Sequence, residues 1–324
     1  MSVLLTGGTG IVGNAIARAL VDRGRRVRAL VRSLERGRAL LPPICELVQG
    51  DVTDPASIRR ALDGCTTVYH AAGLPEQWLR DPSTFTRVNV GGTANMIDAA
   101  LAARVEKFVY TSTIDVFAAT PGVEFDESTI AVEPKGTDYE RSKQEADRLV
   151  TAALGRGLPA VFLHPSAVYG PITASSPGLN DFIAQLLRHE VPMLLPGGMP
   201  VVYASDVGAG HVLADEHGKP GARFILSESC WTLAGIARAV ADTVGLTRIP
   251  RVMPRAVAHA VAYAGEALSK LTRRPPLLPR GQLHFLELDS RPSGRRARDE
   301  LGWSPLPFRE GLVPTVAFLE RGSA

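Results

Sequence analysis

A tyrosine and a lysine four residues apart give the sharpest chemical signal in the chain. Tyr139 and Lys143 stand in the run YERSK, and residues four apart share one face of a helix. A free tyrosine has a pKa of about 10, but a neighbouring ammonium favours the phenolate and lowers that pKa. We therefore expect Tyr139 to act as a general acid when a carbonyl is reduced, and as a base in the reverse direction.

Three hydroxyl residues at the end of an apolar run could hold the substrate oxygen. Thr111, Ser112 and Thr113 close the run KFVYTST at 107–113, which predicts a strand. A lone YxxxK pattern on a helix is common by chance. Its value here comes from the order of the signals, since a glycine turn comes first, the hydroxyl-rich strand end second, and YxxxK at the start of a long helix third.

The glycine turn lies in TGGTGIVG at 6–13, between an expected strand at 2–6 and an expected helix at 10–23. Gly7 permits the tight turn, Gly10 leaves room for a pyrophosphate, and Gly13 lets helix and strand pack closely. The N-terminus of the helix offers N–H groups and partial positive charge to the anion. We expect cofactor contacts here from Gly7, Thr9, Gly10, Ile11, Val12 and Gly13.

A basic residue ends the second expected strand, at 26–32. Arg32 stands about twenty residues after the glycines, where an acidic residue selects NAD and an arginine accommodates the 2′-phosphate of NADP. Its guanidinium matches a phosphate in charge and shape, so NADP is favoured and NAD remains possible. Arg32 could instead simply point to water. After the next strand, Asp51 could bond the adenine amino group or merely cap a helix, with Val52 beside it.

Short apolar runs alternate with helix-period segments over the first 165 residues. Strands are expected at 2–6, 26–32, 45–49, 67–71, 107–113 and 160–164, and helices at 10–23, 84–103 and 139–154. This alternation predicts an α/β fold, a doubly wound parallel sheet of Rossmann type. Prolines and glycines cluster after Pro171. We expect a dinucleotide-binding domain at 1–171 and a smaller substrate lobe at 172–324, although a late strand can rejoin the sheet.

Bulk composition limits the possible partners. The 324 residues are 45% hydrophobic with a net charge of +3, and the three cysteines form neither a CxxC pair nor a metal spacing. We therefore expect no metal and a reducing compartment. The arginine clusters at 23–26 and 295–298 lack interleaved aromatics, so we expect no nucleic-acid partner. No leader pattern or membrane-length apolar run is evident. The expectation is a cytoplasmic protein without a membrane partner, acting on a small molecule.

The motifs together resemble the extended short-chain dehydrogenase/reductase family, over nearly the whole chain. They are TGGTGIVG at 6–13, HAAG at 70–73, VNVGGT at 88–93, VYTST at 109–113, YERSK at 139–143, VYGP at 168–171, ASDVGAGH at 204–211 and RARDELGWSP at 296–305. The resemblance implies that Thr113 is the catalytic hydroxyl with Ser112 in support. It implies that Tyr139 moves the proton and that Lys143 also bonds the nicotinamide ribose.

The resemblance also implies further cofactor contacts and an assembly. The expected cofactor residues beyond the glycine turn are Arg32, Asp51, Val52, Ala71, Ala72, Gly73, Thr111, Tyr139, Lys143, Pro165 and Val168, of which the last two would border the nicotinamide. The helices at 84–103 and 139–154 look like those that form the usual homodimer of the family. Substrate-lining candidates are Leu74, Trp78, Phe117, Tyr169 and residues 172–203, which could equally be packing core.

Departures from the family's subclasses indicate the reaction. Dehydratases carry Thr-Asp-Glu at the strand end, whereas this run is Thr-Ser-Thr; epimerases carry an asparagine before the VYG motif, whereas this chain reads HPSAVYG at 164–170. The pattern is closer to dihydroflavonol reductases and 3β-hydroxysteroid dehydrogenases. We expect an NADP(H)-dependent ketone or aldehyde reductase with a small, hydrophobic substrate. The alternatives are an NAD-dependent nucleotide-sugar epimerase and a non-catalytic cofactor-binding regulator.

Overall fold

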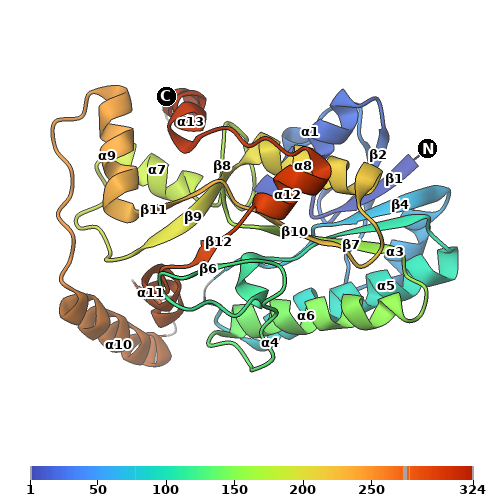
Figure 1. Ribbon diagram of the computed structural model, residues 1–324, viewed down its shortest axis with the longest axis horizontal. Coiled ribbons are helices and arrows are strands. Elements are labelled where there is room, and N and C mark those ends of the chain that lie inside the picture. The colour runs from blue at the N-terminus through green and yellow to red at the C-terminus, as the bar shows by residue number, and fades with distance from the viewer. Residues whose placement is uncertain (1, 77, 273–275, 277, 323–324) are drawn as a thin grey trace.

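A seven-stranded parallel sheet forms the centre of the computed structural model (Figure 1), which describes residues 2–76, 78–272, 276 and 278–322. The strand order is β10-β7-β5-β4-β1-β2-β3. The strands are β1 (Ser2–Thr6), β2 (Arg26–Val31), β3 (Glu46–Gln49), β4 (Cys65–His70), β5 (Lys107–Thr111), β7 (Ala160–Pro165) and β10 (Arg223–Leu226). Val3, Leu4 and Leu5 are all fully buried, because helices cover a parallel sheet on both faces.

Helices on the two faces make the fold doubly wound, as predicted. The helices α1 (Ile11–Asp22), α2 (Leu34–Leu40), α8 (Ala204–His217) and α12 (Arg295–Leu301) pack on one face, and α3 (Pro55–Leu62), α5 (Gly92–Ala103) and α6 (Asp138–Leu154) on the other. Figure 1 shows these two layers above and below the sheet. Helices α1 and α8 approach closely, since a Cβ added at Gly208 would lie 2.3 Å from the carbonyl oxygen of Ala15.

One strand from beyond residue 171 completes the sheet. The strand β10 pairs in parallel with β7, with Leu226 opposite Pro165, and α8 precedes it on the sheet face. One edge strand of the sheet, β10, therefore comes from late in the chain, and β7 separates it from β5. The division of the chain near residue 171 stays a prediction.

The remaining C-terminal elements build a second core beside the first. A three-stranded sheet joins β8 (Ala167–Tyr169), β9 (Gly198–Tyr203) and β11 (Ser229–Thr232). It packs with the helices α7 (Asn180–Leu187), α9 (Leu233–Val244) and α13 (Phe308–Gly322). Farther from the main sheet, α10 (Arg255–Thr272) packs on α11 (Arg280–Glu287) through Ala258, Ala262 and Leu283. A short ladder pairs β6 (Glu124–Phe125) with β12 (Arg291–Pro292).

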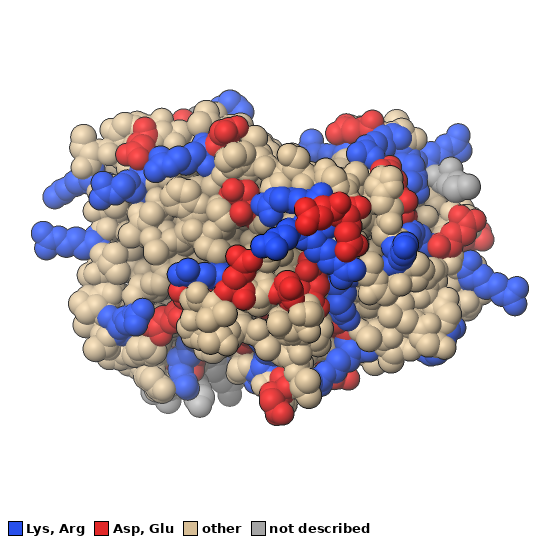
Figure 2. Space-filling model, in the orientation of Figure 1, with Lys and Arg blue, Asp and Glu red and all other residues tan. Residues whose placement is uncertain are grey.

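Charged side chains of both signs mix on the face shown in Figure 2. The arginine-rich segments are partly neutralised by ion pairs, such as Arg23 with Glu216 at 2.7 Å and Arg296 with Glu300 at 2.8 Å. Among the described residues, no helix has both the length and the apolar character needed to cross a membrane.

Two predicted elements differ from their observed form. The strand expected to reach residue 113 ends at Thr111, and Thr113 instead caps a short 3₁₀ helix, η2 (Ile114–Val116). The helix expected at 84–103 begins as α4 (Ser83–Phe85) and passes through a π-helical segment, η1 (Thr86–Gly91), before α5. Such π segments are common at functional sites because the wider turn redirects side chains.

Candidate active site

The catalytic candidates on α6 lie in its first two turns. Thr137 caps the helix, accepting from the backbone N–H of Glu140 while the Glu140 carboxylate accepts from the N–H of Thr137. This reciprocal capping box satisfies two backbone donors and fixes where the helix begins. Tyr139 is therefore held in the first turn, with Lys143 one turn farther along the same face.

Thr113 links the surroundings of Tyr139 to a buried carboxyl group. The Thr113 hydroxyl acts on the phenol of Tyr139, where it opposes the rise in the phenol pKa that burial causes. That hydroxyl donates to Oδ2 of Asp115 at 2.8 Å, and the N–H of Asp115 approaches the same oxygen at 3.3 Å. Thr113 and Asp115 are both buried. The structure thus brings the predicted tyrosine and threonine together and adds a carboxyl group that the sequence reasoning did not assign.

Lys143 is held by the backbone of the neighbouring strand. Its Nζ donates to the carbonyl oxygen of Thr111 at 3.0 Å and lies 3.9 Å from where a Cβ on Gly73 would be. Burial lowers the pKa of Lys143 to about 8, although Asp147 and Asp115 oppose that shift. The ammonium therefore sits between the ends of β4 and β5, next to the predicted cofactor cleft.

The predicted lowering of the Tyr139 pKa is wrong for the chain on its own. Burial raises the pKa of Tyr139 above its usual value, and the charge of Asp115 raises it further, while the hydrogen bond with Thr113 opposes both. The physical reason is that the nearest charges to the phenol are carboxylates, whereas the Lys143 ammonium is turned to the Thr111 carbonyl. The protonated phenol of Tyr139 is therefore favoured over the phenolate, which suits proton donation to a carbonyl oxygen.

The glycine turn has a backbone geometry that any larger side chain would disrupt. Gly7 has φ +73°, and a Cβ there would lie 2.4 Å from the carbonyl oxygen of Ala71; one on Gly13 would lie 2.2 Å from the carbonyl oxygen of Gly7. At Gly10 a Cβ would meet nothing closer than 3.5 Å. Helix α1 begins at this point with no side-chain cap and no acidic residue in its first turn. These features fit a dinucleotide pyrophosphate, for which the backbone N–H groups and the helix dipole provide the site.

A segment beyond residue 171 lies against this turn. The N–H of Ser175 donates to the carbonyl oxygen of Thr9 at 2.8 Å, and the N–H of Ile11 donates to the carbonyl oxygen of Ser176 at 3.4 Å. A pyrophosphate oxygen that bonds the Ile11 N–H therefore has to displace the Ser176 carbonyl. The contact is long, so this exchange requires the loss of only a weak hydrogen bond.

Several predicted cofactor residues line the same end of the sheet. Ala71 and Ala72 follow β4 and donate their N–H groups to Thr6, through its carbonyl oxygen at 3.3 Å and its hydroxyl at 3.2 Å. Gly73 comes next, beside Lys143. Arg32 is exposed directly after β2. Asp51 accepts from the N–H and the hydroxyl of Thr53, both at 2.8 Å, whereas Asp54 caps α3.

Four other predicted cofactor residues have side chains that take part mainly in packing or in contacts with neighbouring elements. The hydroxyl of Thr111 bonds Nε2 of His211 on α8 at 2.9 Å, so only its carbonyl group faces Lys143. The Thr111 side chain is therefore turned to α8, because alternate strand residues face opposite sides of the sheet. The cofactor contact of Thr111 stays a prediction. Val52 packs on Gly92, and Val168 lies in the core under α1. Pro165 ends β7 as a buried residue.

Ser112 is held in a buried polar network rather than at the phenol. Its hydroxyl donates to Oδ2 of Asp147 at 2.6 Å, and Arg223 of β10 pairs with Oδ1 of Asp147 at 2.8 Å. His164 joins the network, with Nε2 at 3.3 Å from Arg223 and Nδ1 at 3.1 Å from the carbonyl oxygen of Thr113. The network ties β5, α6, β7 and β10 together behind the site, which gives Ser112 a supporting place rather than a reacting one.

The sequence reasoning missed four polar residues around the site. Asp115 follows Thr113 by two positions, and Asp147 follows Lys143 by four, so spacing could have indicated both. Asn89 stood in a quoted motif without a role; it donates from Nδ2 to Ser142 at 2.9 Å and accepts from the N–H of Leu74 at 2.7 Å. Arg223 carries no local signal, because only the pairing of β10 with β7 brings it to Asp147.

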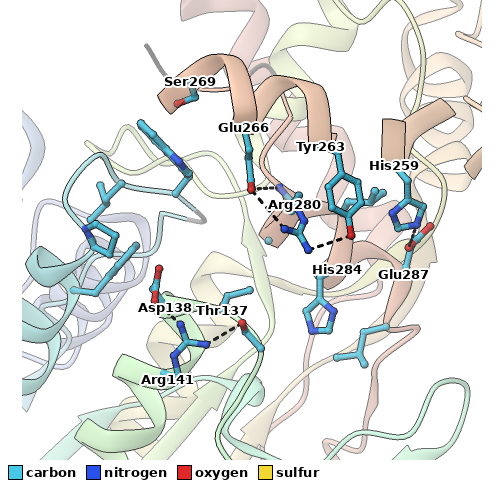
Figure 3. Close-up of a pocket in the computed structure, with 18 of the residues that line it drawn as sticks. Thr137, Asp138, Arg141, His259, Tyr263, Glu266, Ser269, Arg280, His284 and Glu287 are labelled. Atoms are coloured by element: carbon cyan, nitrogen blue, oxygen red, sulfur yellow. Dashed lines mark hydrogen bonds and ion pairs between the residues drawn. The ribbon is translucent and has the colours of Figure 1, made fainter. Parts of the chain in front are cut away.

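A cavity of about 1110 Å³ opens beside the first turn of α6. Figure 3 shows Thr137, Asp138 and Arg141 on one side and the residues of α10 and α11 on the other. The ring of Phe85, in the cavity wall, contacts the ring of Tyr139 with centroids 6.3 Å apart. Apolar side chains lining the cavity include Trp78, Leu79, Pro82, Phe85, Tyr263, Leu283 and Leu288.

Among the predicted lining residues, Trp78 lies in this cavity wall. Phe117 and Tyr169 do not reach it, because both are fully buried in packing clusters. Tyr169 donates instead to the carbonyl oxygen of Phe308 at 3.3 Å. Of the two alternatives left open for these residues, packing core is therefore the one observed, since an aromatic side chain near a strand end can serve the core as well as a pocket.

Comparison with known proteins identifies the family. The model of the NAD dependent epimerase/dehydratase family matches residues 3–226. The chain belongs to this family. It is an NAD(P)-dependent oxidoreductase of the extended short-chain dehydrogenase/reductase type, as the motifs predicted.

Two curated relatives and one solved structure illustrate the range of this family. A putative dihydroflavonol 4-reductase of Synechocystis is 29% identical, over 98% of this chain and 94% of its own length. A 3 beta-hydroxysteroid dehydrogenase/Delta 5-->4-isomerase of Mycobacterium tuberculosis is 30% identical, over 94% of this chain and 86% of its own length. UDP-glucose 4-epimerase of Thermus thermophilus, solved with NAD, matches all of both chains with a TM-score of 0.80 and 26% identity.

Proposed function

We propose that this protein is an NADP(H)-dependent reductase that converts a ketone or aldehyde of a small hydrophobic molecule to the alcohol, or the reverse. The observation that carries the proposal is the convergence of Tyr139, Thr113 and Lys143 at the carboxyl end of β5, beside the uncapped N-terminus of α1. Ligands of open α/β sheets bind at this edge. The dihydroflavonol and hydroxysteroid relatives support a reductase over a nucleotide-sugar epimerase.

The chain's own groups divide the work in this proposal. When bound, the nicotinamide supplies or takes the hydride. Tyr139 donates its proton to the substrate oxygen in reduction, because burial keeps the phenol protonated. Thr113 holds the same oxygen. Lys143 contacts the nicotinamide ribose, and its buried charge stabilises the phenolate that forms.

The cavity beside α6 supports an apolar substrate. Most of its charged groups pair with each other, as His259 does with Glu287 at 3.0 Å. Arg280 likewise donates to the phenol oxygen of Tyr263 at 3.2 Å, stacks on that ring and lies 4.0 Å from Glu266 (Figure 3). The aromatic and aliphatic walls are thereby left to contact the ligand, a lining typical of sites for hydrophobic molecules.

The decisive test is a screen of NADPH oxidation against ketones, aldehydes, sterols and flavanones. We expect turnover with at least one hydrophobic carbonyl compound, and no cofactor retained through purification. A protein that purifies with tightly bound NAD and interconverts nucleotide sugars would be an epimerase instead. Binding of NADPH with no turnover of any compound would favour the regulator.

The preference for NADP rests on Arg32, an exposed residue just past β2. Arg32→Asp replaces a phosphate-binding guanidinium with an acid that suits ribose hydroxyls. We expect the ratio of kcat/KM for NADPH to that for NADH to fall by about tenfold or more. The control is Arg38→Asp, an exposed arginine on α2. An unchanged ratio in the Arg32 variant would show that another residue selects the cofactor.

We further propose that the enzyme is a cytoplasmic homodimer. Helices α5 and α6 lie side by side on one face of the sheet, and they correspond to the pair expected at the interface. Sedimentation analysis tests the assembly directly, and a monomer at micromolar concentration would contradict it.

A further inference from the structure

The buried carboxyl group of Asp115 has no role in the reaction proposed above. Asp115 is 8% exposed, and its Oδ2 takes the only hydroxyl hydrogen of Thr113 at 2.8 Å. A threonine hydroxyl has one hydrogen to donate and two lone pairs that accept. The Thr113 hydrogen is therefore directed at Asp115 and not at a substrate oxygen.

We propose that Asp115 is a positioning residue whose protonation state decides whether the Thr113 hydroxyl can donate to the substrate oxygen. When ionised, Asp115 can only accept, so it holds the single hydroxyl hydrogen of Thr113. When protonated, Asp115 donates to the Thr113 oxygen. Thr113 then turns its own hydrogen to a substrate carbonyl and joins Tyr139 as a second donor to that oxygen.

This inference rests on the proposed function for its catalytic consequence. Reduction needs two donors at the carbonyl oxygen, so it requires neutral Asp115. Burial raises the pKa of Asp115 to about 6, with a further rise from Glu140, while the Thr113 hydroxyl, Lys135 and Lys143 oppose it. The switch therefore falls in an accessible pH range: kcat/KM for reduction is high below pH 6 and falls as pH rises through it.

The effects of the other titratable groups around Asp115 can be separated from the effect of Asp115 itself. Glu140 and Lys143 face it from α6, and Lys135 from the loop before that helix. His164 contacts the carbonyl group of Thr113, but burial lowers its pKa to about 3. His284 lies 4.0 Å from Glu140, so its contribution is tested separately with His284→Gln.

The test compares Asp115→Asn with wild type from about pH 5 to about pH 7, where Lys143 stays mostly protonated. The asparagine amide is neutral at every pH and can donate to the Thr113 oxygen. We expect kcat/KM for carbonyl reduction to fall about tenfold per pH unit above the inflection in wild type, and to stay flat in the variant. The matched controls are Glu133→Gln, an exposed carboxylate nearby, and His284→Gln; both should keep the inflection.

A second readout needs neither cofactor nor substrate. In protein with isotope-labelled tyrosine, the NMR signal of the Tyr139 ring, assigned by its absence from Tyr139→Phe, should titrate with a midpoint near pH 6. That titration should vanish in Asp115→Asn and persist in both controls. An inflection that persists in Asp115→Asn, or that disappears with His284, would overturn the proposal. Because this measurement is independent of turnover, it decides the role of Asp115 even if the proposed reaction is wrong.

Discussion

Tyr139→Phe is expected to lower kcat for carbonyl reduction by about 10² or more while leaving cofactor affinity within about twofold. The phenol is the group placed to give a proton to the substrate oxygen, and the Thr113 hydroxyl just past the end of β5 acts on it. Phenylalanine keeps the ring and its contact with Phe85 in the cavity wall. The loss should therefore fall on the chemical step, which pre-steady-state reduction with saturating NADPH measures.

The matched control for this loss is Tyr203→Phe. Tyr203 is a half-buried residue of β9 whose ring packs on Tyr169 in the second core. The kcat of Tyr203→Phe should stay close to that of wild type. If Tyr139→Phe keeps full turnover, a different group supplies the proton. A large loss of NADPH binding in that variant would mean that the phenol holds the cofactor instead.

Asp147→Ala is expected to lower the free energy of unfolding by about 3–5 kcal/mol, because it leaves the Arg223 guanidinium buried without its carboxylate. Side-chain exposure is only 5% for Asp147 and 13% for Arg223. The Ser112 hydroxyl also loses its acceptor. Urea unfolding followed by circular dichroism measures the change, and Asp98→Ala on the exposed face of α5 is the control.

A double variant that lacks both Asp147 and Arg223 shows whether the single variant is destabilised by an unpaired buried charge or by the lost contact. If the unpaired guanidinium causes most of the damage, the double variant Asp147→Ala/Arg223→Ala should be less destabilised than the sum of the single variants. Simple additivity would mean that the two residues act separately. The activity of Asp147→Ala should be lower than that of wild type even at urea concentrations at which the variant is still folded, since the network holds α6 against the end of β5.

The Asp147–Arg223 pair also predicts how the stability of the protein depends on pH in the acidic range. Burial alone would raise the pKa of Asp147, but His164, Arg223 and the Ser112 hydroxyl together lower it below its usual value of 3.8. A depressed carboxyl pKa contributes stability that is complete above the unfolded value and is lost as pH falls through the folded value. We expect Asp147→Asn to reduce the stability of the protein near pH 7 and to weaken its loss of stability below about pH 4.

Local patterns in the sequence were sufficient to predict the parallel sheet and the order in which the site motifs follow one another along the chain. The glycines at 7 and 13 could be assigned from the sequence because their positive φ or close backbone approach excludes other residues at those points. The helical spacing of Tyr139 and Lys143 required only the geometry of one turn. The strand–helix alternation required a parallel sheet, and the carboxyl ends of its strands had to meet at one edge.

Only the tertiary structure decided which partners the polar groups take. Nothing local indicates that Lys143 bonds the Thr111 carbonyl rather than the phenol, or that Arg223 reaches Asp147 through the pairing of β10 with β7. Such choices depend on how α6 lies against β5 and on which groups lose their water, and both follow from packing between distant segments. The sequence by itself indicated a phenol, an ammonium and a hydroxyl near a glycine turn. The fold decided that the hydroxyl hydrogen of Thr113 goes to a buried carboxyl group, Asp115.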